Sequence, residues 1–237
     1  MSLQGSGYDT LAQSTRFFMD PYARFSDRLN QVSLDGLFVE DEYGRRQLKP
    51  ADQLQASLAP ERLSAFGRAL GLVLRGKVMI DLGCGVPDLS RLPVIVAEGL
   101  GAREYVGVDR NMKPDLLEQH ASNDAHGSMP RNYVRGDLLP YLADLPQSEG
   151  TCFYLAGIEP VDHRGSTTHA YIAASLTEMQ RIAVPGDSIV IGLGTTGFDP
   201  TGYGFVRTHV ATDLNRYGDE LLTHQIFTTS GSELRNA

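Results

Sequence analysis

Cysteines, basic clusters and long apolar runs are all scarce in this chain. Its 237 residues include two cysteines, Cys84 and Cys152, whose spacing suggests neither a metal site nor a disulfide framework. Both are expected to be small buried residues in a reducing compartment. No apolar run approaches the roughly 20 residues that a membrane-spanning helix needs, and the N-terminus lacks the basic-then-apolar layout of a signal peptide. We therefore expect a cytoplasmic protein with no membrane partner.

Positive charge is also in short supply, with 21 basic against 29 acidic residues and a formal net charge of −8. Nucleic-acid-binding surfaces are usually basic, and no Lys/Arg cluster occurs beyond Arg45-Arg46. The composition thus argues against a polynucleotide partner. It leaves the oligomeric state open, a homodimer included.

The most informative segment is residues 78–85, Val-Met-Ile-Asp-Leu-Gly-Cys-Gly. Its apolar start predicts a buried parallel strand. Gly83 and Gly85, directly after it, allow a tight turn that passes close to a ligand. The dinucleotide-binding pattern Gly-x-Gly-x-x-Gly would need glycine at Asp88, and the Gly-Lys-Ser/Thr of a phosphate-binding P-loop is missing. The segment therefore predicts a ligand-binding turn of another kind.

Asp81, two residues before the first glycine, distinguishes this loop from those alternatives. The pattern resembles motif I of the class I S-adenosylmethionine (SAM)-dependent methyltransferases, Asp/Glu-x-Gly-x-Gly-x-Gly, with Pro87 at the third glycine position. A carboxylate here would repel a pyrophosphate and attract the sulfonium and ammonium groups of SAM. The structural alternative is an Asp81 that only caps the following helix.

From Lys77 onward, apolar runs alternate with helical patterns. The expected strands are 77–82, 104–109, 132–135, 152–157, 188–193 and 220–228. The expected helices are 60–74, 90–99, 114–122, 166–183 and 207–217. This alternation predicts an α/β fold with a doubly wound, mostly parallel sheet, and the resemblance implies a Rossmann-like methyltransferase sheet of six to seven strands.

The chain divides into two parts that we expect to belong to one domain. Residues 76–237 would form the SAM-binding core, and residues 1–75 a helical N-terminal extension. Within the extension, residues 9–31 have an apolar face at helical spacing. Residues 37–48 could form a hairpin or a loop around Gly44.

Three acids lie at or just after the ends of the first three expected strands of the core. Asp81, Asp109 and Asp137 are each 28 residues apart, about one strand-helix unit. They should therefore lie at the carboxyl-end edge of a parallel sheet, where open α/β folds bind ligands. For a single acid, a turn or helix cap is the commoner role.

Asp109 and Asp137 match motifs II and III of the methyltransferase family by position. The resemblance implies that Asp109 accepts hydrogen bonds from the ribose hydroxyls, and that Asp137 accepts from the adenine amino group, with Leu138 against the ring. The residues expected at the cofactor are Asp81, Gly83, Cys84, Gly85, Asp109, Arg110, Asp137, Leu138, Ala156 and Gly157.

The loop after the fourth strand, residues 156–164, should face the acceptor. It lacks the Asn/Asp-Pro-Pro-Tyr/Phe signature of enzymes that methylate amino groups of adenine, cytosine or glutamine. His163 is the first candidate for a general base and His169 the second, because imidazole titrates near neutrality; either could equally be a surface histidine without a role. Glu159 and Asp162 could hold a divalent metal as in catechol-type enzymes, but the further Asp-Asn pair of those enzymes is absent, so no metal site is predicted.

The N-terminal segment offers candidate acceptor or lid residues. In the family, N-terminal helices often close the cofactor site, which would place Arg16, Phe17, Phe18 and Tyr22 over it. Glu159, in the loop after the fourth strand, is a further candidate on the acceptor side. The aromatic residues could instead belong to the core. Residues 15–23 also resemble the N-terminal segment of leucine-carboxyl-methyltransferase-like proteins, in which an arginine holds the substrate carboxylate.

The sequence thus predicts a SAM-dependent methyltransferase acting on a small-molecule acceptor at an oxygen or carboxylate, with S-adenosylhomocysteine as product. Three alternatives stay open. One is a methyltransferase-fold protein that has lost catalysis and serves as a binding or scaffold module. An NAD(P) oxidoreductase would suit Asp109, but not the glycine spacing or Asp81. A spermidine-synthase-like aminopropyltransferase would usually carry more acids around the fourth strand.

Overall fold

The structure is a computed structural model that describes most of the expected core. The described residues are 38–40, 46–48, 63, 65–85, 91–112, 129–148, 150–156, 169–192, 195, 197–214 and 220–229. A small antiparallel hairpin of β1 (Phe38–Glu40) and β2 (Arg46–Leu48) precedes the core. The expected hairpin is therefore confirmed. The expected helices at 9–31 and 114–122 lie outside the described residues.

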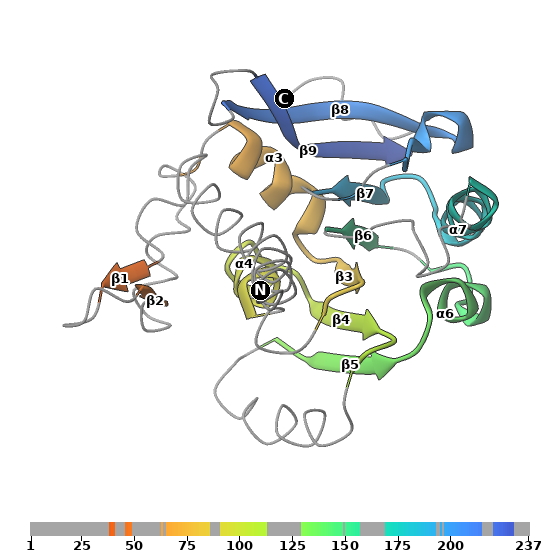
Figure 1. Ribbon diagram of the computed structural model, residues 1–237, viewed down its shortest axis with the longest axis horizontal. Coiled ribbons are helices and arrows are strands. Elements are labelled where there is room, and N and C mark those ends of the chain that lie inside the picture. The colour runs from red at the N-terminus through yellow and green to blue at the C-terminus, as the bar shows by residue number, and fades with distance from the viewer. Residues whose placement is uncertain are drawn as a thin grey trace, which may run out of the picture.

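Seven strands form one mixed sheet in the order β5-β4-β3-β6-β7-β9-β8 (Figure 1). Their bounds are β3 Val78–Leu82, β4 Glu104–Asp109, β5 Arg131–Arg135, β6 Thr151–Leu155, β7 Ser188–Ile191, β8 Phe205–Leu214 and β9 Glu220–Thr229. The first five of these are mutually parallel, whereas β9 runs antiparallel to both β7 and β8. The predicted doubly wound, mostly parallel sheet is confirmed, with seven strands.

The path of the chain through the sheet places a candidate ligand site. It runs outward from β3 to β4 and β5, and then crosses back to β6 on the other side of β3. The strand order therefore reverses between β3 and β6. In open α/β sheets, ligands bind at such a reversal, outside the carboxyl ends of the strands.

Helices cover both faces of the sheet. The helices α3 (Ala65–Leu74) and α4 (Arg91–Gly99) lie on one side, and α6 (Leu138–Asp144) and α7 (His169–Ile182) on the other (Figure 1). None of the described helices has the length and apolar content to cross a lipid bilayer. The helices at 60–74, 90–99 and 166–183 are thus confirmed within a few residues, and the division of the chain at residue 75 stays a prediction.

Alternation along β3 explains the two cores. Met79 packs among side chains of α3 and α4, whereas Ile80 and Leu82 pack among side chains of α6 and α7. Successive side chains of a strand point to opposite faces, so Asp81 shares the face of Met79. Because both faces are covered, β3, β6 and β7 are buried almost throughout, and this accounts for their continuous apolar sequence.

One sequence-based expectation about the fold is wrong. The helix expected at 207–217 is instead β8, a ten-residue strand paired with β9. Val206, Thr208 and Val210 alternate along it, and β-branched side chains at every second position suit a pleated strand. The tertiary partner β9 therefore decides the conformation of this segment.

Candidate functional site

The glycine loop after β3 is held against the end of β4. The backbone N–H groups of Gly83 and Cys84 donate to the carbonyl oxygen of Val108, at 2.8 and 3.2 Å. The N–H of Gly85 donates to Oδ2 of Asp109, at 2.9 Å. Gly83 and Gly85 have φ values of 79° and 74°, in the left-handed region that favours glycine. The two glycines are thus required by the turn itself.

Asp109 has a structural role as well as a predicted ligand role. Its Oδ2 accepts from Gly85, and its Oδ1 accepts from the N–H of Asn111 at 2.7 Å. The second bond is the local turn contact that aspartates often make. A carboxylate has about four acceptor positions on its two oxygens, so each oxygen of Asp109 can accept one further bond from a ligand.

Asp81 is enclosed beneath the loop. Its side chain is 2 % exposed, and its Oδ2 accepts a hydrogen bond of 2.6 Å from the hydroxyl of Tyr105 on β4. Burial raises the pKa of Asp81 to about 7; the bond from Tyr105 lowers this pKa and the charge of Asp109 raises it. The described partner of Asp81 is thus Tyr105, and a cation bound nearby would favour the ionised form of Asp81.

Cys84 is a packing residue of this site. A Cβ on Gly107 of β4 would lie 3.0 Å from Cys84 Sγ, 3.0 Å from Tyr133 Cδ1 and 3.1 Å from Tyr105 Cε1. Burial, and then the charges of nearby carboxyls, raise the pKa of the Cys84 thiol far above its usual range. The thiol therefore stays protonated, and Cys84 fits the space that Gly107 leaves open.

A row of small residues crosses the sheet next to the loop. Leu82 pairs with Leu155, Leu155 with Ile191, and Ile191 with Gln225. One position further toward the carboxyl edge, the corresponding residues are Gly83, Ala156, Gly192 and His224. Because successive side chains of a strand alternate between faces, Gly83, Ala156 and Gly192 belong to the face that α3 and α4 cover.

His224 closes this row, and no sequence pattern had indicated it. Its ring is 6 % exposed and lies 5.7 Å from the ring of Phe66 on α3. A Cβ on Gly192 would approach Ala156 Cβ to 3.0 Å and His224 Nε2 to 3.3 Å. Burial lowers the pKa of His224 to about 4, so the imidazole is neutral at physiological pH. Only the register of β9 brings it to the carboxyl edge.

The end of β5 presents a second carboxylate. Asp137 precedes α6 but makes no side-chain cap hydrogen bond with it, so its carboxylate is not used as a helix cap. Leu138 is buried at the first position of α6, and Arg110 is exposed in the turn after β4. The hydroxyl of Tyr171, on α7, accepts from the N–H of Leu139 at 3.3 Å.

The acceptor-side predictions are largely untested. His169 is exposed at the first position of α7. The other predicted residues lie outside the described residues: Arg16, Phe18, Tyr22, Gly157, Glu159 and His163. The structure therefore brings together Asp81, Gly83, Cys84, Gly85 and Asp109, and places Ala156 beside them in the row.

Comparisons with known proteins give structural similarity only. No protein-family description matches the chain, and no curated protein matches it. A SAM-dependent methyltransferase from Methanosarcina mazei is 12% identical, with 70% of this chain and 98% of that chain covered and a TM-score of 0.46. A 16S rRNA (adenine(1408)-N(1))-methyltransferase from Catenulisporales acidiphilia is 12% identical, with coverages of 84% and 98% and a TM-score of 0.43.

A precorrin-6y C5,15-methyltransferase from Geobacter metallireducens is 20% identical, with 71% of this chain and 89% of that chain covered and a TM-score of 0.40. With all three TM-scores below 0.5, these similarities decide nothing about the reaction or the acceptor. The strand order and strand directions of the chain itself define its fold. Five parallel strands, with β9 antiparallel between β7 and the edge strand β8, form a mostly parallel, Rossmann-like α/β sheet.

Proposed function

We propose that this protein binds SAM and transfers its methyl group to a small-molecule acceptor, with release of S-adenosylhomocysteine. The observation that carries the proposal is the bond from the Gly85 N–H to Asp109 Oδ2. It joins the glycine loop to the carboxylate at the end of β4, beside the point where the strand order reverses. A ligand lying over the loop would therefore meet the free acceptor positions of Asp109.

The electrostatics of the site favour a cationic ligand. The charge of Asp109 raises the pKa of Asp81, which means that the two carboxyl groups act on each other across the loop. A sulfonium and an ammonium would relieve this repulsion, whereas a pyrophosphate would add to it. SAM carries both cations and no phosphate, and this supports SAM over a dinucleotide.

Different residues of the site would contact different parts of the cofactor. Asp109 would accept hydrogen bonds from the ribose hydroxyls, and Asp137 from the adenine amino group. Gly83, Gly85 and Ala156 would let the cofactor lie close to the backbone. Bound SAM supplies an already activated methyl group, so the chain mainly aligns the acceptor and, for some acceptors, takes up a proton. His163 and His169 are the proposed bases for that proton.

The proposed acceptor is a small molecule with a hydroxyl or carboxylate group. The net charge of −8 disfavours a polynucleotide, and the loop after β6 lacks the signature of amino-group methylation. Transfer of a labelled methyl group from SAM to a panel of hydroxylated and carboxylic compounds, with ribosomal RNA as the contrasting acceptor, tests this point. Loss of transfer in His163→Gln or His169→Gln, with SAM affinity unchanged, would identify the base.

Calorimetry with S-adenosylhomocysteine and with NADH tests the cofactor. S-adenosylhomocysteine should bind and NADH should not. Asp109→Ala should weaken S-adenosylhomocysteine by about 10- to 100-fold, because hydrogen bonds to a charged group contribute about 1.5–3 kcal/mol. Asp144→Ala, at an exposed position at the end of α6, should leave the affinity unchanged. Binding of NADH without S-adenosylhomocysteine would overturn the proposal.

A further inference from the structure

Tyr171 connects the two helices on one face of the sheet. It lies in the first turn of α7, and its hydroxyl oxygen accepts a 3.3 Å hydrogen bond from the N–H of Leu139 in α6. Leu139 is two residues after Asp137. The phenol of Tyr171 therefore reaches from α7 to the segment that follows the carboxyl end of β5.

Two oppositely charged residues act on this hydroxyl. Burial raises the pKa of Tyr171, and the hydrogen bond from Leu139 lowers it; the charge of Asp137 raises this pKa, and that of Arg110 lowers it. Asp137 follows β5 and Arg110 follows β4. Its bond to Leu139 places the hydroxyl at the start of α6, which follows the carboxyl end of β5.

The hydroxyl of Tyr171 can make a second hydrogen bond in addition to the one that it accepts from Leu139. A phenol that accepts from a backbone N–H still has its own proton to donate. Among the described residues, none is seen to accept that proton. Asp137, the residue before α6, is an acceptor whose side chain makes no cap hydrogen bond to α6. Because the Tyr171 hydroxyl is bonded to Leu139, two residues after Asp137, a donor and an acceptor both lie at the start of α6.

Adenine has the complementary pattern. Its amino group is a donor, and the ring nitrogen next to it, N7 on one side or N1 on the other, is an acceptor. Hypoxanthine has an oxygen acceptor in place of the amino group. That oxygen would face the carboxylate of Asp137, which is also an acceptor, so the two could not form a hydrogen bond. A pair of Tyr171 and Asp137 can therefore distinguish the two bases.

We propose that Tyr171 is a specificity-determining residue of the cofactor site, donating its hydroxyl proton to a ring nitrogen of the adenine whose amino group donates to Asp137. This inference rests on the proposed function, because it assumes that the ligand at this edge is an adenosyl compound. It adds a recognition residue from α7, a helix that carries none of the residues of the glycine loop or of the three acids.

The test measures binding of S-adenosylhomocysteine and three analogues to the full chain and to Tyr171→Phe. The analogues are S-inosylhomocysteine and the 7-deaza and 1-deaza forms of S-adenosylhomocysteine. The wild-type protein should bind S-adenosylhomocysteine more tightly than the inosyl compound. Tyr171→Phe should weaken S-adenosylhomocysteine by about 5- to 10-fold, as expected for one hydrogen bond.

The deaza analogues identify the bond itself. One of the two should bind wild-type protein about 5- to 10-fold more weakly than S-adenosylhomocysteine, and Tyr171→Phe should bind that analogue and S-adenosylhomocysteine equally, since the bond is already absent. Tyr141→Phe is the matched control, because Tyr141 is also part-buried. The charge that acts on the pKa of Tyr141 is that of Glu104, at the opposite end of β4 from Asp109. Tyr141→Phe should change none of these affinities.

The outcomes separate this inference from the proposed function. If wild-type protein binds no S-adenosylhomocysteine, the proposed function fails and the inference fails with it. If wild-type protein binds it and Tyr171→Phe binds it equally well, only the role of Tyr171 is overturned. If Tyr171→Phe binds more weakly but remains sensitive to both deaza substitutions, Tyr171 acts through packing and the proposed hydrogen bond is wrong. Circular dichroism verifies that both variants are folded.

Discussion

The hydroxyl of Tyr105 donates a 2.6 Å hydrogen bond to Oδ2 of Asp81. Both side chains are buried, with Tyr105 among residues of α3 and α4. The acid of the glycine motif is thus oriented by a side chain of the neighbouring strand. The glycine loop and β4 are thus joined through this buried carboxylate as well as through the bonds to Val108 and Asp109.

Replacing Tyr105 by phenylalanine tests the strength of this contact. The variant should lose about 1.5–3 kcal/mol of unfolding free energy at pH 8, where Asp81 is largely ionised, since this is the usual value of a hydrogen bond to a charged group. The loss at pH 5 should be smaller, because Asp81 is then protonated. Urea unfolding at both pH values measures the difference, with Tyr141→Phe as the control. Equal losses at the two pH values would contradict a bond to an ionised carboxylate.

Asp81 and His224 should give opposite pH dependences of stability. The pKa of Asp81 is raised from 3.8 to about 7 on folding. Its contribution to the free energy of unfolding is therefore fully present below pH 3.8 and is lost as the pH rises through 7. The pKa of His224 is lowered from 6.5 to about 4, so its contribution is present above pH 6.5 and lost as the pH falls through 4. Between these limits the two slopes largely offset each other.

Single substitutions should expose each slope. In Asp81→Asn, stability should rise by roughly 3 kcal/mol between pH 4 and 6.5, because His224 remains. In His224→Leu, stability should fall by roughly 4 kcal/mol between pH 4 and 7, because Asp81 remains. Unfolding in urea across this interval gives both slopes. Parallel pH profiles in the two variants would disprove the assignment.

SAM binding should also depend on the ionisation of Asp81. Its pKa near 7 means that a cationic ligand must first meet a partly protonated carboxyl group at neutral pH. Affinity for SAM should therefore increase between pH 6 and 8. The increase should be up to about 10-fold, because the ionised fraction of Asp81 rises by about that factor over this interval. Asp81→Asn should bind SAM more weakly at pH 8 and show no such increase. Calorimetry at three pH values checks both statements.

Gly107 should not tolerate a side chain. A Cβ there would lie 3.0–3.1 Å from atoms of Cys84, Tyr133 and Tyr105, so Gly107→Ala must displace a buried group and should cost about 1–3 kcal/mol. Gly136→Ala is the matched control, because a Cβ at Gly136 would meet no atom within 4 Å, and its effect should stay within about 0.5 kcal/mol. Thermal or urea unfolding compares the two. A Gly107→Ala variant as stable as Gly136→Ala would contradict this packing.

The parallel part of the fold could be predicted because each of its strands carries its own signal. Buried strands such as β3 and β6 are continuous apolar runs, and Asp81, Asp109 and Asp137 lie at or just after the carboxyl ends of β3, β4 and β5. The antiparallel strand β8 is neither a continuous apolar run nor ended by such an acid, and its pairing with β9 decides its conformation. The short helix α6 contains Pro140 and offers little helical pattern.

The candidate site also contains some residues that the sequence could predict and others that it could not. Asp109 was predictable because its position follows from the strand that precedes it. Tyr105, Tyr171 and His224 belong to no motif, and each reaches the site through contacts with residues distant in the sequence, such as Asp81 for Tyr105 and Leu139 for Tyr171. Such contacts are fixed by packing and register, which a single sequence does not contain.

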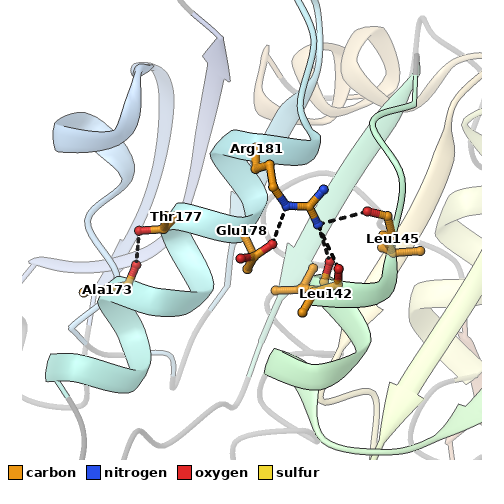
Figure 2. A network of polar contacts seen from close by, with 7 residues as sticks. Leu142, Leu145, Ala173, Thr177, Glu178 and Arg181 are labelled. Carbon is orange, nitrogen blue, oxygen red and sulfur yellow. Dashed lines mark hydrogen bonds and ion pairs between the residues drawn. The ribbon is translucent and has the colours of Figure 1, made fainter.

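The last prediction concerns Arg181, which holds the end of α6 against α7 (Figure 2). Its Nη2 donates to the carbonyl oxygens of Leu142, Ala143 and Leu145, at 3.0, 3.2 and 2.9 Å, and its Nε to Glu178. The last carbonyl groups of a helix have no partner within it, and a planar guanidinium can serve several of them at once.

Arg181→Lys keeps the charge but loses the planar guanidinium that donates to several carbonyl groups. The substitution should cost about 1–2 kcal/mol of unfolding free energy. Thr177→Ala, on the same helix, removes only an exposed hydroxyl that donates to Ala173 (Figure 2), and should change stability by less than about 0.5 kcal/mol. Because α6 begins directly after Asp137, Arg181→Lys should also weaken S-adenosylhomocysteine slightly, by about 2-fold. A stability loss no larger than that of Thr177→Ala would show that α6 is held by its buried leucines alone.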